Sequence, residues 1–383
     1  MMRRSVLIIA APFGYGPAAR ALLVAQGLVD VADVTILSAR DAYRFVERHK
    51  PDGVACRKGV FRKLFLSAND LAAFDLFISI NNEPAVLHLL DLGLAARTVF
   101  IDSVLPWRAA SHPPESREPI LSYLVQDFPG VRAHLAQCQA QTVALTAPML
   151  WSKPHDGVRP PRPKGQVTLH VGGVTSPLVS WDMLRGPIEG FLARAHALTH
   201  SFGRRLVVIG SRHLGQWTQA NAPDVAILGD ISPPETAALI GRSEVLLSTP
   251  GIGAIYEAMA SAVPVVVFPP TNSTQVLQYA VYTDAGLPGT MAEPASKALR
   301  QNAAGLPWQQ QTTYSIDFLH HHLAACLSEL PRHLELLLAP GRSASGSTPG
   351  ERAAAELFGA LSTTSAIDLI RQALGAMPQR PAG

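Results

Sequence analysis

A glycine-rich turn in the second half of the chain carries the groups that a bound nucleotide would need. Thr249, Pro250 and the run Gly251–Gly253 follow an apolar stretch, and a helix-like stretch with Glu257 comes directly after them. Glycine lets main-chain amides approach a ligand closely, and a helix N-terminus favours an anion. A carboxylate one turn further on can accept hydrogen bonds from a diol. The turn therefore predicts a site for a phosphate and its ribose.

Similar glycine turns follow the first predicted strand of each half of the chain. The pair Gly172–Gly173 follows the apolar run Val167–Val171, and Gly14 and Gly16 follow Val6–Ala10. Strands that alternate with helices predict a parallel sheet covered on both faces. Ligands bind at the carboxyl ends of the strands in such sheets. We therefore expect an α/β fold in which two Rossmann-like domains face a cleft.

Apolar periodicity predicts the elements that position these turns. The expected strands are Val6–Ala10, Val34–Leu37, Leu76–Ile80, Thr98–Ile101, Val167–Val171, Arg205–Ile209, Val225–Leu228, Val245–Leu247 and Val263–Phe268. The expected helices are Ala19–Leu28, Glu83–Leu92, Met183–Ala197, Pro234–Ile240 with Ser232 as its cap, Ala254–Ala260 and Ala353–Ala376. The predicted domains are 1–155 and 166–335, with a proline-rich linker at 156–165 and a flexible segment and C-terminal helix in 336–383.

Composition excludes several classes of protein. A length of 383 residues with 48% apolar residues favours two domains with ample cores. The net charge of +3, without arginine and lysine clusters among aromatics, argues against nucleic acid as a partner. No apolar run reaches the roughly 18 residues of a membrane helix, and we interpret the apolar N-terminus as a buried strand rather than a signal peptide. Cys56, Cys138 and Cys326 are scattered, so we expect free thiols in the cytoplasm and no metal site.

The spacing of Gly251, Glu257, Pro264 and Pro269 resembles a known pattern. Over residues 167–287 the chain is similar to the C-terminal domain of GT-B glycosyltransferases. It resembles both the lipid II-forming N-acetylglucosaminyltransferase and the UDP-sugar-dependent enzymes that act on small molecules. In the first half the resemblance is looser, and it rests on the turn at Gly14–Pro17 and on an acidic residue followed by a Pro-Trp pair.

The resemblance implies roles for the residues of the three turns. The amides of Gly251, Ile252 and Gly253 would hold the pyrophosphate without a metal or other cofactor, Glu257 the ribose, main-chain groups near Ile231 the base, and Gln275 the donor sugar. Gly172 and Gly173 would close over the donor, while Gly14 and Gly16 would let the first domain approach the reacting sugar. Thr249 and Thr274 differ from the family, which has histidine or arginine at the first position and often an acid at the second.

The family often carries a histidine base in the first glycine turn, and this chain has none there. A hydroxyl acceptor must lose its proton during attack. Asp102, which follows a predicted strand and should face the cleft, is the first candidate for the base, and Glu83 is the second. Asp102 could instead cap or turn the chain. Glu257 could be a first-turn acid favoured by the helix dipole.

Further polar residues also have plain structural interpretations. Gln275 could be an exposed loop amide. His170 lies in a buried-strand pattern and is expected to be structural. The run His320–His322 lies on a predicted helix, where consecutive residues do not share a face, so it does not indicate a metal site.

The sequence thus predicts an inverting, metal-independent glycosyltransferase. The donor would be a UDP- or dTDP-linked hexose or aminosugar, and the acceptor a hydroxyl of a small molecule or natural product. The alternatives are a nucleotide-sugar 2-epimerase, a non-catalytic nucleotide-sugar-binding protein, and an enzyme at a membrane surface. The last would use a basic patch at Arg57, Lys58, Arg62 and Lys63, which is otherwise a solvated basic face. The sequence does not indicate an oligomeric state.

Overall fold

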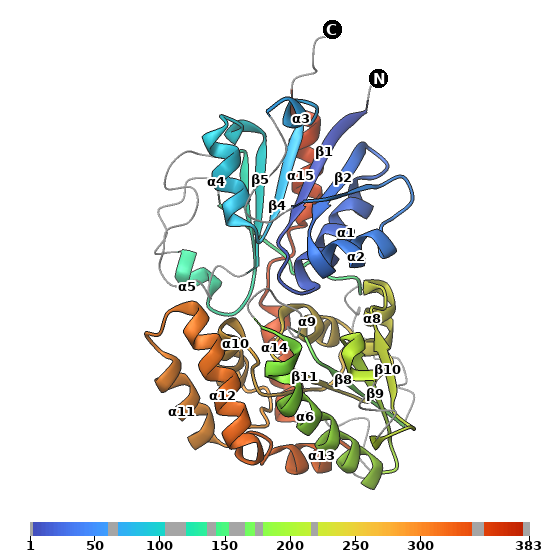
Figure 1. Ribbon diagram of the computed structural model, residues 1–383, viewed down its shortest axis with the longest axis vertical. Coiled ribbons are helices and arrows are strands. Elements are labelled where there is room, and N and C mark those ends of the chain that lie inside the picture. Colours follow the sequence, from blue (N-terminus) through green and yellow to red (C-terminus); the bar gives the residue numbers. More distant parts are fainter. Residues whose placement is uncertain are drawn as a thin grey trace. The chain divides into compact units, whose positions relative to one another are not determined.

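The computed structural model describes residues 3–59, 68–103, 120–135, 143–152, 165–172, 179–215, 221–338 and 348–377. The chain divides into two compact units. Unit 1 consists of Met1–Met149 together with Leu361–Gly383, and unit 2 consists of Leu150–Ala360. The last helix of the chain, which the sequence analysis assigned to a separate tail, therefore lies in unit 1 (Figure 1).

Unit 1 is built on one parallel sheet. Its strands are β1 (Arg4–Ala10), β2 (Ala32–Ser38), β3 (Ala55–Lys58), β4 (Leu76–Ile80), β5 (Thr98–Asp102), β6 (Ser122–Gln126) and β7 (Val143–Thr146), in the order β3-β2-β1-β4-β5-β6-β7. Its helices are α1 (Gly16–Leu28), α2 (Arg40–His49), α3 (Ala68–Ala72), α4 (Glu83–Asp91), α5 (Val131–Leu135) and α15 (Ala366–Ala376), with a short 3-10 helix at Ala95–Arg97. Every paired strand is parallel to its neighbour.

Unit 2 repeats this plan on a smaller sheet. Its strands are β8 (Gln166–His170), β9 (Arg205–Gly210), β10 (Ala226–Gly229), β11 (Val245–Ser248) and β12 (Val265–Val267), in the order β10-β9-β8-β11-β12. Its helices are α6 (Trp181–Ser201), α8 (Pro233–Gly241), α9 (Ile252–Ala260), α10 (Ser273–Asp284), α11 (Glu293–Ala303), α12 (Trp308–Cys326), α13 (Leu330–Leu338) and α14 (Pro349–Gly359), with a 3-10 helix at Arg212–Leu214. The predicted α/β fold with two parallel sheets is confirmed.

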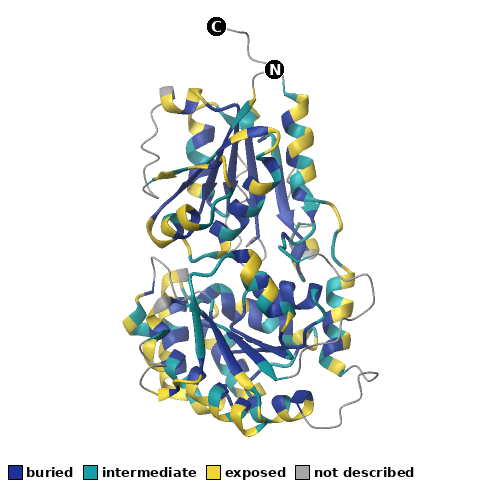
Figure 2. Cartoon of the chain, turned by 90° about the vertical axis from the view of Figure 1, so that its right-hand side faces the viewer, coloured by how far each residue is buried: buried dark blue, intermediate teal, exposed yellow. Residues whose placement is uncertain are grey.

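The cores lie where the apolar runs predicted them. Val6 to Ile8 of β1 and Leu246 and Leu247 of β11 are completely buried. Figure 2 shows the strands of both sheets as mostly buried. Helices on both faces remove these apolar strands from water, which is the main favourable term for such sheets.

Three strands of unit 1, β3, β6 and β7, were not predicted from the sequence. β3 carries four residues of which none is fully buried, so it lacks the apolar run that marks a strand. β6 and β7 contain polar residues such as Gln126 and Thr146, which are buried at the sheet edge instead of exposed. A pattern based on apolar runs passes over strands of this kind.

The predicted single helix over Ala353–Ala376 is wrong, because two helices occupy this region. In α14, Thr348 caps the helix and exchanges hydrogen bonds with Glu351. Ser365 then starts α15 by accepting a hydrogen bond from the amide of Asp368. Two separate capping signals therefore divide the apparently continuous helix. The cap predicted at Ser232 is confirmed, since it forms a capping box with Glu235 at the start of α8.

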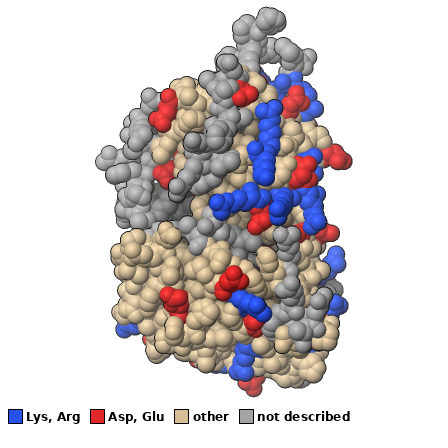
Figure 3. All heavy atoms as spheres, in the orientation of Figure 1, with Lys and Arg blue, Asp and Glu red and all other residues tan. Residues whose placement is uncertain are grey.

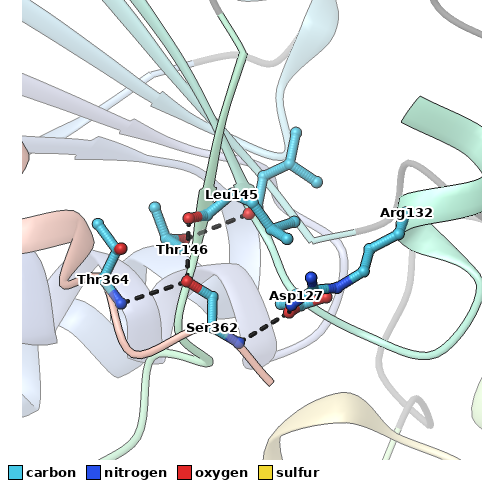
Figure 4. Close-up of polar contacts among 7 residues, drawn as sticks. Asp127, Arg132, Leu145, Thr146, Ser362 and Thr364 are labelled. Atoms are coloured by element: carbon cyan, nitrogen blue, oxygen red, sulfur yellow. Dashed lines mark hydrogen bonds and ion pairs between the residues drawn. The ribbon is translucent and has the colours of Figure 1, made fainter. Parts of the chain in front are cut away.

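The segment before α15 is fixed to the end of the sheet of unit 1 (Figure 4). Asp127, which follows β6 and is almost completely buried, accepts hydrogen bonds from the Ser362 amide at 2.7 Å and from the Arg132 guanidinium at 2.6 Å. The Ala147 amide donates to the carbonyl of Thr364 at 2.7 Å. The C-terminal segment thus supplies hydrogen-bond partners beyond the edge strand β7.

Exposed cations gather on one side of unit 1. Arg40, Arg44 and Arg48 of α2 and Arg57 and Lys58 of β3 are exposed, and Figure 3 shows Lys and Arg side chains running over this side. The other basic residues of the predicted patch lie outside the described residues. Within the described part of the chain, no helix is both long enough and apolar enough to span a membrane.

Candidate functional site

Three of the predicted donor-binding residues meet at the carboxyl edge of the sheet of unit 2. β8 and β11 are neighbours, so the turns that follow them lie side by side. The amide of Gly172 donates to Oγ1 of Thr249 at 3.0 Å, and this hydroxyl donates back to the Gly172 carbonyl at 3.2 Å. Gln275 donates to the same carbonyl through Nε2 at 3.3 Å. Gly172, Thr249 and Gln275 therefore form one hydrogen-bonded group, and Gly173 lies outside the described residues.

The placement of Gln275 corrects the predicted loop. Gln275 lies in the first turn of α10, because Asn272 caps this helix by accepting a hydrogen bond from the Gln275 amide. Its side chain is buried, and its Oε1 accepts hydrogen bonds from the amide and hydroxyl of Thr271, both at 2.8 Å. The alternative of an exposed loop amide is therefore wrong. Thr274 precedes it in α10 and is half-buried.

The N-terminus of α9 follows directly after Thr249. Gly251 is the N-cap residue, and no side chain caps this end of the helix. The apolar side chain of Ile252 is buried. The space beside Gly253 is open, because a Cβ placed on this residue would meet no atom within 4 Å. The first-turn amides of a helix have no partner within the helix, and they carry the positive end of its dipole. This turn has the room and the polarity to accept an anion.

His170 lies beneath the Gly172 turn. Its Nδ1 is 3.4 Å from Oγ of Ser248, whose hydroxyl donates to the Thr249 carbonyl at 2.8 Å. A Cβ on Gly172 would come within 3.0 Å of the His170 ring, so a side chain there would press on the imidazole. Burial lowers the pKa of His170 from 6.5 to about 4. The ring is therefore neutral near pH 7 and adds no fixed positive charge to this edge.

Ile231 lies at the other side of the same sheet. It follows β10, directly after Asp230, which has a positive φ of 56°, and before the α8 cap at Ser232. The strand order separates β10 from β8 by one strand, β9. The predicted base-binding position is thus at the same carboxyl edge as the glycine turns, and its role stays a prediction.

Glu257 has unexpected partners. It lies in the second turn of α9 and is only 6% exposed. Its Oε1 accepts a hydrogen bond from the Trp151 amide at 2.6 Å, and its Oε2 accepts one from the Ser152 amide at 2.9 Å. Glu257, which the sequence predicts to bind a ribose, therefore holds the first residues of unit 2. Its role toward a ribose stays a prediction.

The carboxyl edge of unit 1 holds the remaining predicted residues. Gly14 has a positive φ of 64°, which favours glycine, and Gly16 is the first residue of α1. Glu83 is half-buried at the start of α4, where Asn82 caps the helix by accepting from the Ala85 amide. These positions follow β1 and β4, which are neighbours in the sheet.

Asp102, which was expected to follow the strand, is the last residue of β5 and is completely buried. The hydroxyl of Tyr123 donates to its Oδ2 at 2.9 Å. Alternate residues of a strand share a face, and Phe100 pairs with Tyr123 in register, so Asp102 and Tyr123 lie on one face of the sheet. Its role as a base stays a prediction.

Two features of these edges were not predicted from the sequence. The amides of Trp151 and Ser152 carry no side-chain signal, so nothing in the sequence could indicate them. Gln126, at the end of β6, accepts hydrogen bonds through Oε1 from the Met149 amide and from Arg20, while its buried Nε2 has no partner. For Gln126, the sequence offered one signal, which is a polar residue at the end of an apolar strand. Among the described residues, no group of three or more His, Cys, Asp or Glu side chains could hold a metal.

Comparison with known proteins identifies the fold. No protein-family model matches the chain, and no curated protein does so either. The spinosyn rhamnosyltransferase SpnG has a TM-score of 0.57 at 13% identity, covering 98% of this chain and 100% of that one. The complex of SpnG with spinosyn aglycone gives 0.53 at 14% identity, covering 97% and 99%. Arabidopsis thaliana UGT89C1 with UDP-L-rhamnose gives 0.50 at 11% identity, covering 88% and 100%. The chain has the GT-B fold of these enzymes.

Proposed function

We propose that the chain is an inverting, metal-independent glycosyltransferase. It moves a hexose or an aminosugar from a UDP- or dTDP-sugar to a hydroxyl of a small-molecule or natural-product acceptor. The observation that carries the proposal is the hydrogen-bonded group of Gly172, Thr249 and Gln275 beside the uncapped N-terminus of α9. The relatives support it, since SpnG was solved with thymidine diphosphate and with spinosyn aglycone, and UGT89C1 with UDP-L-rhamnose.

The uncapped turn suits a leaving pyrophosphate. Breaking the bond to the sugar leaves positive charge on an oxocarbenium-like ring and negative charge on the departing phosphate. The amides of Ile252 and Gly253 are fixed by α9, so they can donate to that phosphate without rearranging. The open space at Gly253 leaves room for its oxygens. A neutral His170 would not hold the product by ionic attraction.

The acceptor hydroxyl would attack from the face opposite the leaving group, which inverts the anomeric carbon. In this proposal Asp102 accepts the hydroxyl proton as the new bond forms. The hydrogen bond that the Tyr123 hydroxyl donates to Oδ2 holds this carboxylate in place. Glu83 is the second candidate, since it is half-buried at the start of α4 and closer to solvent.

A non-catalytic nucleotide-sugar-binding protein is the second candidate function. The complete burial of Asp102 favours it, because a base must reach its substrate. A turnover assay with a panel of nucleotide sugars and phenolic or polyketide acceptors separates the two functions. Release of free nucleoside diphosphate that depends on the acceptor supports the enzyme, and stabilisation by the donor without release supports the binding protein.

A thermal-shift screen with UDP, dTDP, GDP, CDP and ADP tests the donor site. A nucleotide that binds only the folded protein stabilises it by about 2.7 kcal/mol at a hundredfold excess over its Kd. We expect UDP or dTDP to raise the Tm and the purine nucleotides to have little effect. Glu257→Ala should weaken the binding by about 1.5–3 kcal/mol. If no nucleotide raises the Tm, the proposed function is wrong.

We also place the protein in the cytoplasm. The thiols of Cys56 and Cys326 are both free, and Cys138 lies outside the described residues. Burial raises the pKa of each of the first two thiols to about 12, with Glu47 contributing at Cys56. Neither thiol is ionised near pH 7, which suits unreactive cysteines in a reducing compartment.

A further inference from the structure

The chain passes from unit 1 into unit 2 after Met149 and returns to unit 1 after Ala360. Helix α9 contacts residues close to both of these points. Glu257 holds the crossing segment, Trp151–Ser152, which belongs to the first residues of unit 2. The neighbouring Tyr256 packs against Phe358 near the end of α14, the last helix of unit 2, with ring centroids 6.3 Å apart. The same helix starts at the proposed phosphate turn. A ligand bound at α9 therefore lies one or two helical turns from the crossing segment.

The hydrogen bonds of the crossing segment leave the Glu257 carboxylate only half used. The Trp151 amide donates to Oε1 at 2.6 Å, and the Ser152 amide donates to Oε2 at 2.9 Å. Hydrogen bonds to an ionised acceptor are short and strong. An ionised carboxylate offers about four acceptor positions, two on each oxygen. One position therefore remains on each oxygen, and two hydroxyls of a ribose could take them.

A ribose could bind in one of two ways. It could displace the two amides, which would leave two main-chain donors without partners in a half-buried place. A donor that loses its partner away from water is unfavourable, so displacement would oppose nucleotide binding. Alternatively, the ribose could use the two remaining positions and leave both amides bonded. The second arrangement loses no hydrogen bond and is favoured.

We propose that Glu257 binds the ribose and the crossing segment at the same time. This inference rests on the proposed function, which supplies the nucleotide. The two amides are positioning groups, because they hold the carboxylate with one free position on each oxygen. Binding of the ribose then stabilises the crossing segment, and an ordered crossing segment favours binding of the ribose, since coupling of this kind is reciprocal.

The arrangement makes the 2′-hydroxyl a point of selection. Each free position accepts one hydroxyl, so a 2′-deoxyribose leaves one of them empty. A hydrogen bond to a charged group is strong enough for us to expect UDP to bind about 10- to 100-fold more tightly than 2′-deoxy-UDP. This preference should depend on the crossing segment, although the segment itself need not touch the nucleotide.

Hydrogen exchange in the wild-type protein tests the coupling directly. The amides of Trp151 and Ser152 should exchange at least about 10-fold more slowly when UDP is bound, because the ribose stabilises their shared acceptor. Calorimetry on the same sample shows whether UDP binds. If UDP binds and these amides exchange at the same rate or faster, the inference is wrong and the proposed function stands. If UDP does not bind and dTDP does, the inference is wrong and the proposed function stands, and if neither binds, both are wrong.

A pair of substitutions at one position tests the role of the amide. Trp151→Pro removes the N–H that donates to Oε1, whereas Trp151→Ala removes the ring and keeps the N–H. We expect Trp151→Pro to reduce the preference for UDP over 2′-deoxy-UDP by about 3- to 10-fold relative to Trp151→Ala. A general loss of stability would weaken both nucleotides equally and leave the ratio unchanged. Equal ratios in the two variants would overturn the inference.

Discussion

The carboxyl edges of the two sheets use their polar side chains differently. In unit 2, Thr249 and Gln275 both bind the main chain of Gly172, so side chains connect neighbouring turns. In unit 1, Asp102 accepts a hydrogen bond from a tyrosine of the next strand. Asp127 accepts hydrogen bonds from an arginine and from the C-terminal segment. The polar side chains at the edge of unit 2 thus hold neighbouring turns together, whereas the carboxylates at the edge of unit 1 accept hydrogen bonds from other parts of that unit.

Because the strand order is the same in the five strands of unit 2 and in the first five of unit 1, topology does not explain this difference. The difference lies in the residue types after each strand. Hydroxyl and amide groups can fix a turn while main-chain amides remain available to an anion. A buried carboxylate needs donors of its own, and it draws them from nearby strands and segments. We therefore expect anion binding from unit 2 and proton transfer from a single carboxylate of unit 1.

The largest expected effect is at Asp102. Asp102→Asn keeps the size of the side chain but removes the negative charge, and turnover should fall by about 10²–10⁴-fold if this group accepts the proton. The Kd of the donor should not change, because unit 2 is expected to bind it. Tyr123→Phe is the matched control, since it removes the hydrogen bond and keeps the charge. Turnover near the wild-type value in Asp102→Asn would make the carboxylate purely structural.

His170 gives unit 2 a dependence on pH. Its folded pKa of about 4 is below the unfolded value of 6.5, so the unfolded chain binds the proton first as the pH falls. This residue should therefore lower the free energy of unfolding between about pH 6.5 and pH 4, by about 3 kcal/mol in all. His170→Asn should remove this part of the slope in denaturant titrations. The same slope in both proteins would show that the ring is accessible to protons in the folded state.

Asp127 tests how far the fold of unit 1 depends on its carboxylates. Asp127→Ala leaves the Ser362 amide and the Arg132 side chain without their acceptor, and we expect a loss of about 1–3 kcal/mol in denaturant unfolding. The control is Asp30→Ala, which removes the partner of Arg371 in an exposed ion pair and should cost about 0–1 kcal/mol. Equal losses in the two variants would mean that the buried carboxylate contributes no more than a surface one.

Removal of metal ions should have the smallest effect. If the amides at the start of α9 stabilise the leaving phosphate, treatment with EDTA should leave the initial rate within about twofold of its value, as expected for a site built from fixed dipoles. The assay would measure release of nucleoside diphosphate. A full loss of activity that magnesium restores would mean that the turn in unit 2 needs a cation to hold the diphosphate.

The sequence predicted the parts of the fold that depend on local patterns. The strand that leads into Thr249, the glycine turn and the helix with Glu257 all follow from apolar runs and from glycine between them. Their presence at one sheet edge follows from parallel pairing. The burial of Gln275 did not follow, because it depends on the cap at Asn272, on Thr271 just before the helix and on the distant turn at Gly172.

By itself, therefore, the sequence determined two parallel sheets and the turns at their carboxyl ends, because periodicity and glycine spacing act within a few residues. Only the tertiary structure decided what the acidic side chains bind. Glu257 takes the amides of residues 105 and 106 positions away, and Asp127 takes an amide 235 positions away. A main-chain amide is the same group at nearly every residue, so no pattern of side chains can mark it as a partner before the chain has folded.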